Sequence, residues 1–122
     1  MRQRETARLW SRQGNDLTDR FPDVAAAAAR MLPALCVVDG ELVALDANGR
    51  LSFDLLQRRL VTSRAHAGKL IGAAPASYMA FDLLAVNAVD IRTRRWTTRR
   101  ERLESLALWA PPLLLTPITC SV

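Results

Sequence analysis

The chain has 122 residues, half of them hydrophobic and 24% charged. A chain of this size forms one domain at most, and it buries roughly two-thirds of its extended surface on folding, which argues against global disorder. Its formal net charge of +5 comes almost entirely from arginine, with sixteen Arg against one Lys. Guanidinium groups suit phosphate oxygens, so one interpretation is an anionic partner. The other is a genome rich in G and C, which favours Arg and Ala codons.

The cysteines and the N-terminus bear on the compartment. Cys36 and Cys120 lie far apart in hydrophobic runs without a Cys-x-x-Cys pair, which predicts buried free thiols in a reducing compartment. Residues 1–5 are charged and lack the apolar core of a signal peptide. The apolar runs fall short of the ~20 residues of a membrane span. We therefore expect a soluble, cytoplasmic protein with no membrane partner.

Hydrophobic periodicity and the Gly and Pro positions divide the chain into strands and helices. The predicted elements, in chain order, are strand 7–12, helix 23–32, strands 35–38 and 41–46, helix 53–60, strand 78–86, short strand 89–91, helix 98–109 and strand 113–116. Residues 63–76, rich in small residues, predict a loop. This order favours an α+β fold with a mostly antiparallel sheet flanked by helices.

Local signals fix several of these boundaries. Pro22 suits the first turn of the alanine-rich helix, and Asp39-Gly40 predicts a tight turn between two strands. Asp-Ala-Asn-Gly at residues 46–49 predicts a second turn, because Asn-Gly accepts positive φ. Thr98 and Glu101 form a capping box, which predicts the start of the last helix. The near-continuous apolar run at residues 78–86 predicts the central strand of the sheet.

Three segments carry residues suited to nucleotide chemistry. Glu41 follows Asp39-Gly40, where its carboxylate could accept a bond from a ribose hydroxyl or help to hold Mg²⁺; an ordinary hairpin is the alternative interpretation. Phe81 lies within Tyr-Met-Ala-Phe-Asp-Leu-Leu at residues 78–84, where it is either a core residue or an aromatic platform for a base. Asp82, flanked by apolar residues, needs a partner if it is buried.

The third segment is Ser-Arg-Gln-Gly at residues 11–14, where Arg12 before a glycine turn suits a phosphate or ribose contact. In their order, these segments and Phe-Asp-Leu-Leu-Gln-Arg-Arg-Leu at residues 53–60 resemble the adenylation domain of bacterial ATP-dependent DNA ligases of the end-joining type. The resemblance covers about residues 8–119. It implies a partial nucleotidyltransferase (ATP-grasp-like) domain.

The resemblance also implies a reaction and its site residues. It implies ATP and Mg²⁺ as cofactors and nicked or broken duplex DNA as partner, with strands sealed through enzyme-AMP and DNA-adenylate in repair and recombination. It assigns Phe81 to stacking on adenine, Glu41 to the ribose or the metal, and Arg12 to a phosphate or ribose contact.

The sequence departs from the family pattern at the nucleophile. Such ligases attach AMP to the lysine of Lys-x-Asp-Gly, whereas Val37 occupies that place before Asp39-Gly40, and Lys69 is the only lysine. The later Glu-Gly and Lys-x-Lys elements and the OB-fold domain are not found either. We therefore expect residues 1–122 to be a partial adenylation domain with no catalytic residue of its own, inactive by itself. It is either a remnant of a ligase gene or a short protein that keeps a nucleotide-binding surface.

A basic cluster near the C-terminal end offers an alternative function. Arg92, Arg94, Arg95 and Arg99 surround Trp96, which suits DNA backbone contact. The alternatives are a solvated helix start or a non-catalytic DNA-binding module that acts through residues 92–102. A related RNA ligase or capping-type nucleotidyltransferase is a third hypothesis. His66 has no Cys, Asp or Glu at ligand spacing, so a surface residue is predicted rather than a metal ligand.

Overall fold

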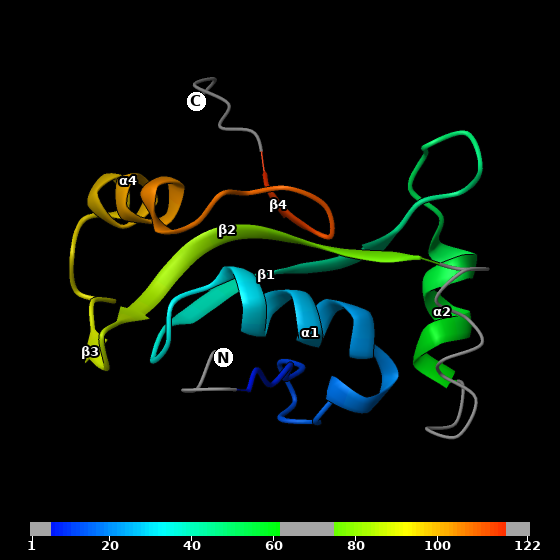
Figure 1. The fold of residues 1–122 in the computed structure, drawn as a ribbon, viewed down its shortest axis with the longest axis horizontal. Coiled ribbons are helices and arrows are strands. Elements are labelled where there is room, and N and C mark those ends of the chain that lie inside the picture. The colour runs from blue at the N-terminus through cyan, green and yellow to red at the C-terminus, as the bar shows by residue number, and fades with distance from the viewer. Residues whose placement is uncertain (1–5, 62–74, 117–122) are drawn as a thin grey trace.

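The computed structural model describes residues 6–61 and 75–116. Most of the predicted loop 63–76, together with His66, Lys69 and Cys120, lies outside these residues. The described elements are η1 (Thr18–Arg20), α1 (Pro22–Met31), β1 (Val37–Ala44), α2 (Phe53–Val61), β2 (Ala76–Val86), β3 (Val89–Asp90), α4 (Trp96–Leu106) and β4 (Leu113–Leu115) (Figure 1).

The sheet is built around β2. β1 and β3 pair with β2 in antiparallel fashion and β4 pairs with it in parallel. In Figure 1, β2 runs through the middle of the molecule with α4 and α1 on either side of it in the view. The α+β class, the mostly antiparallel sheet and the central position of residues 78–86 are confirmed.

The predicted turn at Asp39-Gly40 is wrong, because β1 runs through it as one strand from Val37 to Ala44. Gly40 has no positive φ; it lies where β2 comes very close. A Cβ atom on Gly40 would be 2.3 Å from the backbone oxygen of Met79. The glycine therefore serves close strand approach rather than a reversal of the chain.

The predicted strand at residues 7–12 is also not formed as such. Trp10 makes one isolated antiparallel bridge with Asp16, and Leu17 N donates to Leu9 O over 2.8 Å. Gly14, at φ 85°, closes the turn between these two stretches. The predicted turn at residues 46–49 is confirmed, with Gly49 at φ 76°.

The helices follow the sequence signals except at α4. α1 begins at Pro22 and α2 at Phe53, as predicted. α4 begins at Trp96, two residues before Thr98, and its N-cap Arg95 makes no side-chain capping bond. The capping box therefore does not set this boundary. The helix ends at Leu106, and the indole N–H of Trp109 donates to Leu103 O over 2.9 Å.

Both long helices pack on one face of the sheet. Ala76 packs in a cluster with Val24 of α1, whereas Ala80 packs with Leu103 of α4. Tyr78 contacts both clusters. Because side chains alternate along a strand, these three β2 residues point to the same face. The β2 residues between these three therefore point to the opposite face of the sheet. Neither α1 nor α4 covers that face.

A buried arginine joins α2 to the start of α1. Arg59 is fully buried and its guanidinium donates to Asp23 over 2.6 Å and to Arg20 O over 3.0 Å. Its guanidinium carbon also lies 4.8 Å from the centre of the Phe21 ring. This network fixes α2 at the end of the sheet.

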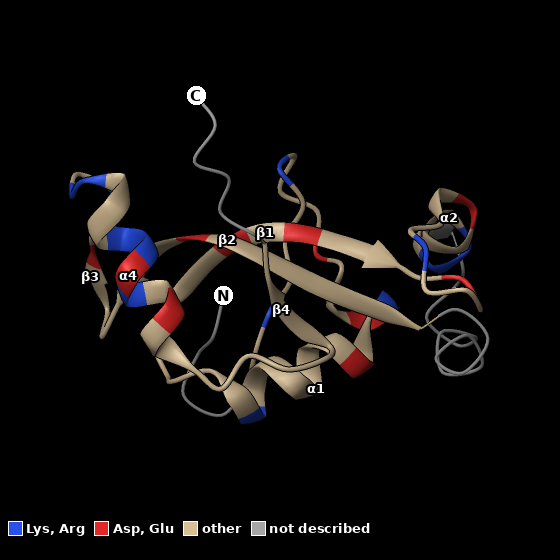
Figure 2. Ribbon diagram, turned by 90° about the horizontal axis from the view of Figure 1, so that it is seen from above, with Lys and Arg blue, Asp and Glu red and all other residues tan. Residues whose placement is uncertain are grey.

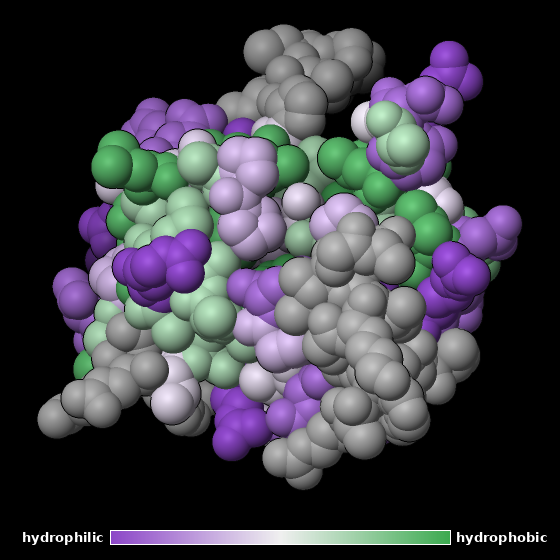
Figure 3. Space-filling view, turned by 45° about the vertical axis from the view of Figure 1, so that its right-hand side comes forward, coloured by the Kyte–Doolittle hydropathy of each residue, from purple (hydrophilic) through white to green (hydrophobic). Residues whose placement is uncertain are grey.

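The surface mixes polar and apolar regions. Figure 3 shows hydrophobic side chains interrupted by hydrophilic ones on the side of the molecule where α2 lies. Leu51 and Phe53 are 68% and 71% exposed.

No described helix is both long and apolar enough to cross a bilayer. Cys36 is buried and outside any disulfide, as predicted, and its thiol donates to Pro33 O over 3.2 Å.

Candidate functional site

Glu41 and Phe81 lie on neighbouring strands. Glu41 is opposite Met79, and Phe81 follows two residues later in β2. Ala80, between Met79 and Phe81, points into the core under α4, so both of its neighbours point to the opposite face. Leu42 packs toward α1, which places Glu41 on that opposite face as well. The structure therefore brings together two of the three predicted nucleotide contacts.

A β-bulge gives Phe81 a special place. Asp39 is opposite Asp82 and Gly40 is opposite Ala80, so Phe81 has no partner in the register. A bulge leaves the extra residue unpaired and increases the local twist, and bulges are frequent beside active sites. Phe81 is half-buried and belongs to neither core cluster. Phe81 therefore belongs to the same sheet face as Glu41 and packs in neither core cluster.

Arg12 lies in a different region, at the mouth of a cavity of about 700 Å³. The turn that carries it is held by Gly14 N donating to Ser11 O over 3.0 Å and by Asn15 N donating to Ser11 Oγ over 3.0 Å. Arg12 is exposed. The cavity lies between the N-terminal segment, α1 and β1, and its lining includes Trp10 and Gly40 but neither Glu41 nor Phe81.

Tyr78 forms part of the wall of this cavity. Its hydroxyl donates to Val38 O over 3.3 Å. Burial first, and then the negative charge of Asp39, raise the pKa of Tyr78 well above its usual value. The phenol therefore stays protonated and acts as a hydrogen-bond donor across the β1–β2 pair. The sequence alone assigns no site role to Tyr78 or Asp39, because only the strand register brings them to this cavity.

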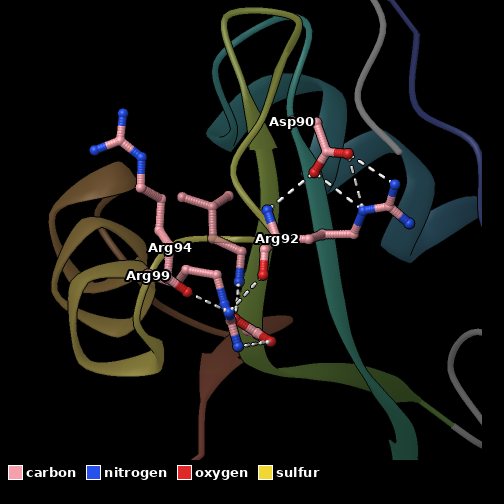
Figure 4. A network of polar contacts seen from close by, with 6 residues as sticks. Asp90, Arg92, Arg94 and Arg99 are labelled. Carbon is pink, nitrogen blue, oxygen red and sulfur yellow. Dashed lines mark hydrogen bonds and ion pairs between the residues drawn. The ribbon is translucent and has the colours of Figure 1, made fainter.

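Among the predicted DNA-contacting arginines, Arg92 pairs with Asp90. Three bonds of 2.7 to 3.0 Å join the Arg92 guanidinium to the Asp90 carboxylate, and both side chains are exposed (Figure 4). These hydrogen bonds lower the pKa of Asp90 to about 2 and raise that of Arg92. Figure 2 shows acidic positions on the β1–β2 pair and both basic and acidic positions on α4.

Arg99 forms an ion pair with Asp82. The partner that the sequence analysis expects for this carboxylate is therefore Arg99. Arg99 Nε donates to Asp82 Oδ1 over 2.9 Å and Nη2 donates to Oδ2 over 3.2 Å. Both side chains are about five-sixths buried, with 16% and 15% exposed. Nη1 of Arg99 also donates to the backbone oxygens of Arg92 and Arg94, over 3.0 and 2.7 Å. Arg99 thus ties the turn at residues 92–95 to β2.

Arg94 and Arg95 differ from these two arginines. Both are exposed, and within residues 6–61 and 75–116 neither side chain takes part in a hydrogen bond or ion pair. In Figure 4, the side chain of Arg94 points away from Arg99 and from the Asp90–Arg92 pair. These two guanidiniums can therefore receive an external anion without breaking an internal contact.

The described residues offer little to a metal ion. Across residues 6–61 and 75–116, no three His, Cys, Asp or Glu side chains gather as they would around a cation. Mg²⁺ is often held by one or two carboxylates together with substrate phosphates. Glu41, which is exposed, fits only as one such carboxylate beside a bound nucleotide.

Comparison with known proteins identifies the family. Residues 1–112 match the family described as ATP dependent DNA ligase domain. The chain belongs to this family. It is 42% identical to DNA ligase C2 of Mycolicibacterium smegmatis over 112 residues, which cover 91% of this chain and 31% of that protein. It is 35% identical over 111 residues to the multifunctional non-homologous end joining DNA repair protein LigD of Mycobacterium tuberculosis, covering 88% of this chain and 13% of the relative.

Solved structures of the same family share the fold. Mycobacterial DNA ligase D complexed with ATP and MES superposes with a TM-score of 0.65 at 29% identity, over 92% of this chain and 35% of that one. The ligase domain of LigD from M. tuberculosis gives a TM-score of 0.62 at 28% identity, over 90% and 32%. The nucleotidyltransferase fold and the resemblance to end-joining ligases are confirmed. The chain spans about a third or less of the length of these relatives.

Proposed function

We propose that this ATP-dependent DNA ligase family chain supplies the adenosine-binding side of a ligase adenylation site. The observation that carries the proposal is the bulge that leaves Phe81 unpaired beside Glu41, on the sheet face opposite the helix-covered core. An aromatic ring and a carboxylate on one surface match the two halves of adenosine, the flat base and the hydroxylated ribose.

Each residue has a distinct role in this proposal. The ring of Phe81 stacks on adenine, a contact worth roughly 1–3 kcal/mol for a base on an aromatic side chain. The Glu41 carboxylate, which has no hydrogen bond or ion pair among the described residues, accepts bonds from ribose hydroxyls. Arg12, which is exposed and lines the neighbouring cavity rather than the Glu41–Phe81 face, offers two parallel donors to a phosphate or the ribose.

ATP would supply the AMP group, and Mg²⁺ would neutralise phosphate charge with Glu41 as one carboxylate ligand. Covalent transfer of AMP requires a nitrogen nucleophile, and this sequence has no lysine in a Lys-x-Asp-Gly context. The chain's own residues therefore bind and orient the nucleotide rather than react with it. In this proposal the chain acts in the cytoplasm, where it meets its DNA partner.

Binding of a fluorescent ATP analogue to the chain tests the proposal. Phe81→Ala should weaken binding by roughly tenfold, and Glu41→Gln should weaken it less, because a neutral amide still accepts one bond. Phe53→Ala is the matched control, since Phe53 is an aromatic residue that is 71% exposed and is not on β1 or β2. Unchanged affinity in Phe81→Ala, or an equal loss in Phe53→Ala, would contradict the proposal.

A second function, contact with the DNA backbone, is favoured by Arg94 and Arg95. Each phosphate that an arginine neutralises releases counterions, so affinity falls steeply as salt rises. Arg94→Ala should flatten the slope of log affinity against log salt by about one unit, whereas Arg50→Ala, at an exposed arginine in the 46–50 turn, should not. A salt slope that is the same in both variants would remove Arg94 from the DNA surface.

A further inference from the structure

The turn at residues 92–95 is rigidly placed although its side chains are exposed. Arg99 holds the backbone oxygens of Arg92 and Arg94 and is itself held by the largely buried Asp82 carboxylate. At the other end, Asp90 accepts a bond from the backbone N–H of Arg92 over 2.9 Å. Ile91, fully within the core, anchors the chain between them. The turn therefore presents its outer side chains in a fixed geometry before any ligand arrives.

The same contacts divide the arginines into two groups. The charges of Arg92 and Arg99 are matched by Asp90 and Asp82. The positive charge that remains on the outside of the turn comes from Arg94 and Arg95, whose guanidiniums are not engaged within the described chain. A partner therefore meets two exposed arginines that are consecutive in the chain.

Trp96 follows directly and is 47% exposed. Its indole N–H has no hydrogen bond within the described residues, in contrast to Trp109, whose N–H is bound to Leu103 O. Leaving a large aromatic side chain half in water sacrifices part of its burial free energy. Trp96 thus directly follows two exposed arginines. Proteins that bind single-stranded nucleic acid combine the same residue types, stacking bases on aromatic faces and pairing phosphates with cations.

We propose that Arg94, Arg95 and Trp96 form a binding site for an unpaired nucleotide at a DNA break, with the two guanidiniums on phosphates and the indole stacked on the base. Within an intact duplex, the faces of internal bases are covered by their neighbours, so the indole gains a partner only at an end, an overhang or a gap. Asp82 and Arg99 act as positioning residues that hold the turn. The inference rests on the proposed DNA partner and is independent of nucleotide binding at Phe81.

The site predicts a preference among DNA ends that can be measured without ATP. The probes are a fluorescein-labelled duplex with a short single-stranded overhang and the same duplex made blunt, both titrated with the 122-residue chain. The wild-type chain should prefer the overhang. Trp96→Ala should weaken overhang binding by roughly fivefold to a hundredfold, the range that stacking energies imply, and should weaken blunt-end binding less, because a blunt end offers only the outer face of its terminal base pair. Trp96→Phe should retain most of the preference, because a phenyl ring still stacks.

The controls separate stacking from folding and from charge. Phe53→Ala, at another exposed aromatic residue, should leave the preference intact, and melting curves of each variant report the fold. Asp82→Asn should weaken binding to both probes without changing the salt slope, since no phosphate contact is lost, whereas Arg94→Ala should flatten that slope. Equal losses on both probes in Trp96→Ala, or a wild-type chain indifferent to the overhang, would overturn the proposal even if the chain binds ATP. Loss of ATP binding alone in Phe81→Ala would leave it standing.

Discussion

Gly40 and Tyr78 lie against each other across the β1–β2 pair, with Cε1 of Tyr78 2.7 Å from the place that a Cβ atom on residue 40 would take. The Tyr78 hydroxyl reaches on to Val38 O, so the ring lies along β1 over the glycine. The ring lies in the wall of the large cavity, and β1 continues as one strand through Asp39-Gly40.

Replacement of Gly40 should destabilise the fold. In Gly40→Ala the new methyl group meets the Met79 backbone oxygen, which cannot turn aside as a side chain can. We expect a loss of about 3 kcal/mol in the free energy of unfolding, at the upper end for overpacked sites. Urea denaturation measures it. Gly14→Ala, with φ 85° but nothing within 4 Å, should cost only about 1 kcal/mol of backbone strain. Equal losses in both variants would contradict this account of Gly40.

The buried guanidinium of Arg59 should matter more than any exposed arginine. Arg59→Met leaves the Asp23 carboxylate, which is 17% exposed, and the Arg20 carbonyl without their donor. Breaking a buried pair from one side typically costs about 3–5 kcal/mol, and the partial exposure of Asp23 argues for the lower end. The same denaturation experiment checks it. Arg92→Met, which breaks the exposed pair with Asp90, is the matched control and should change stability little.

The pKa of Asp90 sets a pH dependence of defined sign. Its folded-state pKa of about 2 lies below the unfolded value of about 3.9. The pair with Arg92 therefore favours folding at pH values above about 4, and that contribution is lost as the pH falls through about 2. An NMR titration of the Asp90 carboxyl carbon should show its midpoint near 2 in the wild type and a higher midpoint in Arg92→Met. A midpoint near 3.9 in both would show that the pair does not form in solution.

Several elements could be predicted from the sequence because their signals are local. Pro22 and the alanine run specify α1, and the apolar stretch at residues 78–86 specifies the central strand. Asp39-Gly40 misleads because the same dipeptide that favours a turn also serves where two strands approach closely. That approach is a property of β2, forty residues away. Thr98 and Glu101 match a capping box, yet the helix starts two residues earlier, at Trp96. Near that start, Arg99 binds Asp82 and the turn at residues 92–95, and these contacts depend on the tertiary structure rather than on the local sequence.

The candidate site shows the same division. Glu41 and Phe81 could be named from family resemblance, and their shared surface follows from strand alternation. The bulge that frees Phe81, however, depends on the register between β1 and β2. From the sequence alone, Arg92, Arg94, Arg95 and Arg99 form one basic cluster whose members cannot be told apart. Whether an arginine faces solvent or a carboxylate depends on where Asp82 and Asp90 fall in the sheet, and periodicity does not contain that information.

The reaction of the chain with ATP gives the last prediction. Incubation with ATP and Mg²⁺ followed by intact-mass measurement should show no added AMP. Ligases of this family carry AMP on a lysine in Lys-x-Asp-Gly, and here Val37 precedes Val38, Asp39 and Gly40 in that pattern. Lys69→Arg is the matched variant, since it removes the one lysine of the sequence and keeps its charge. An AMP adduct in the wild type that disappears in Lys69→Arg would show that Lys69 is a nucleophile and that the chain reacts with ATP. With no adduct in either variant, Phe81 and Glu41 would remain binding residues whose reaction requires a lysine supplied from outside these 122 residues.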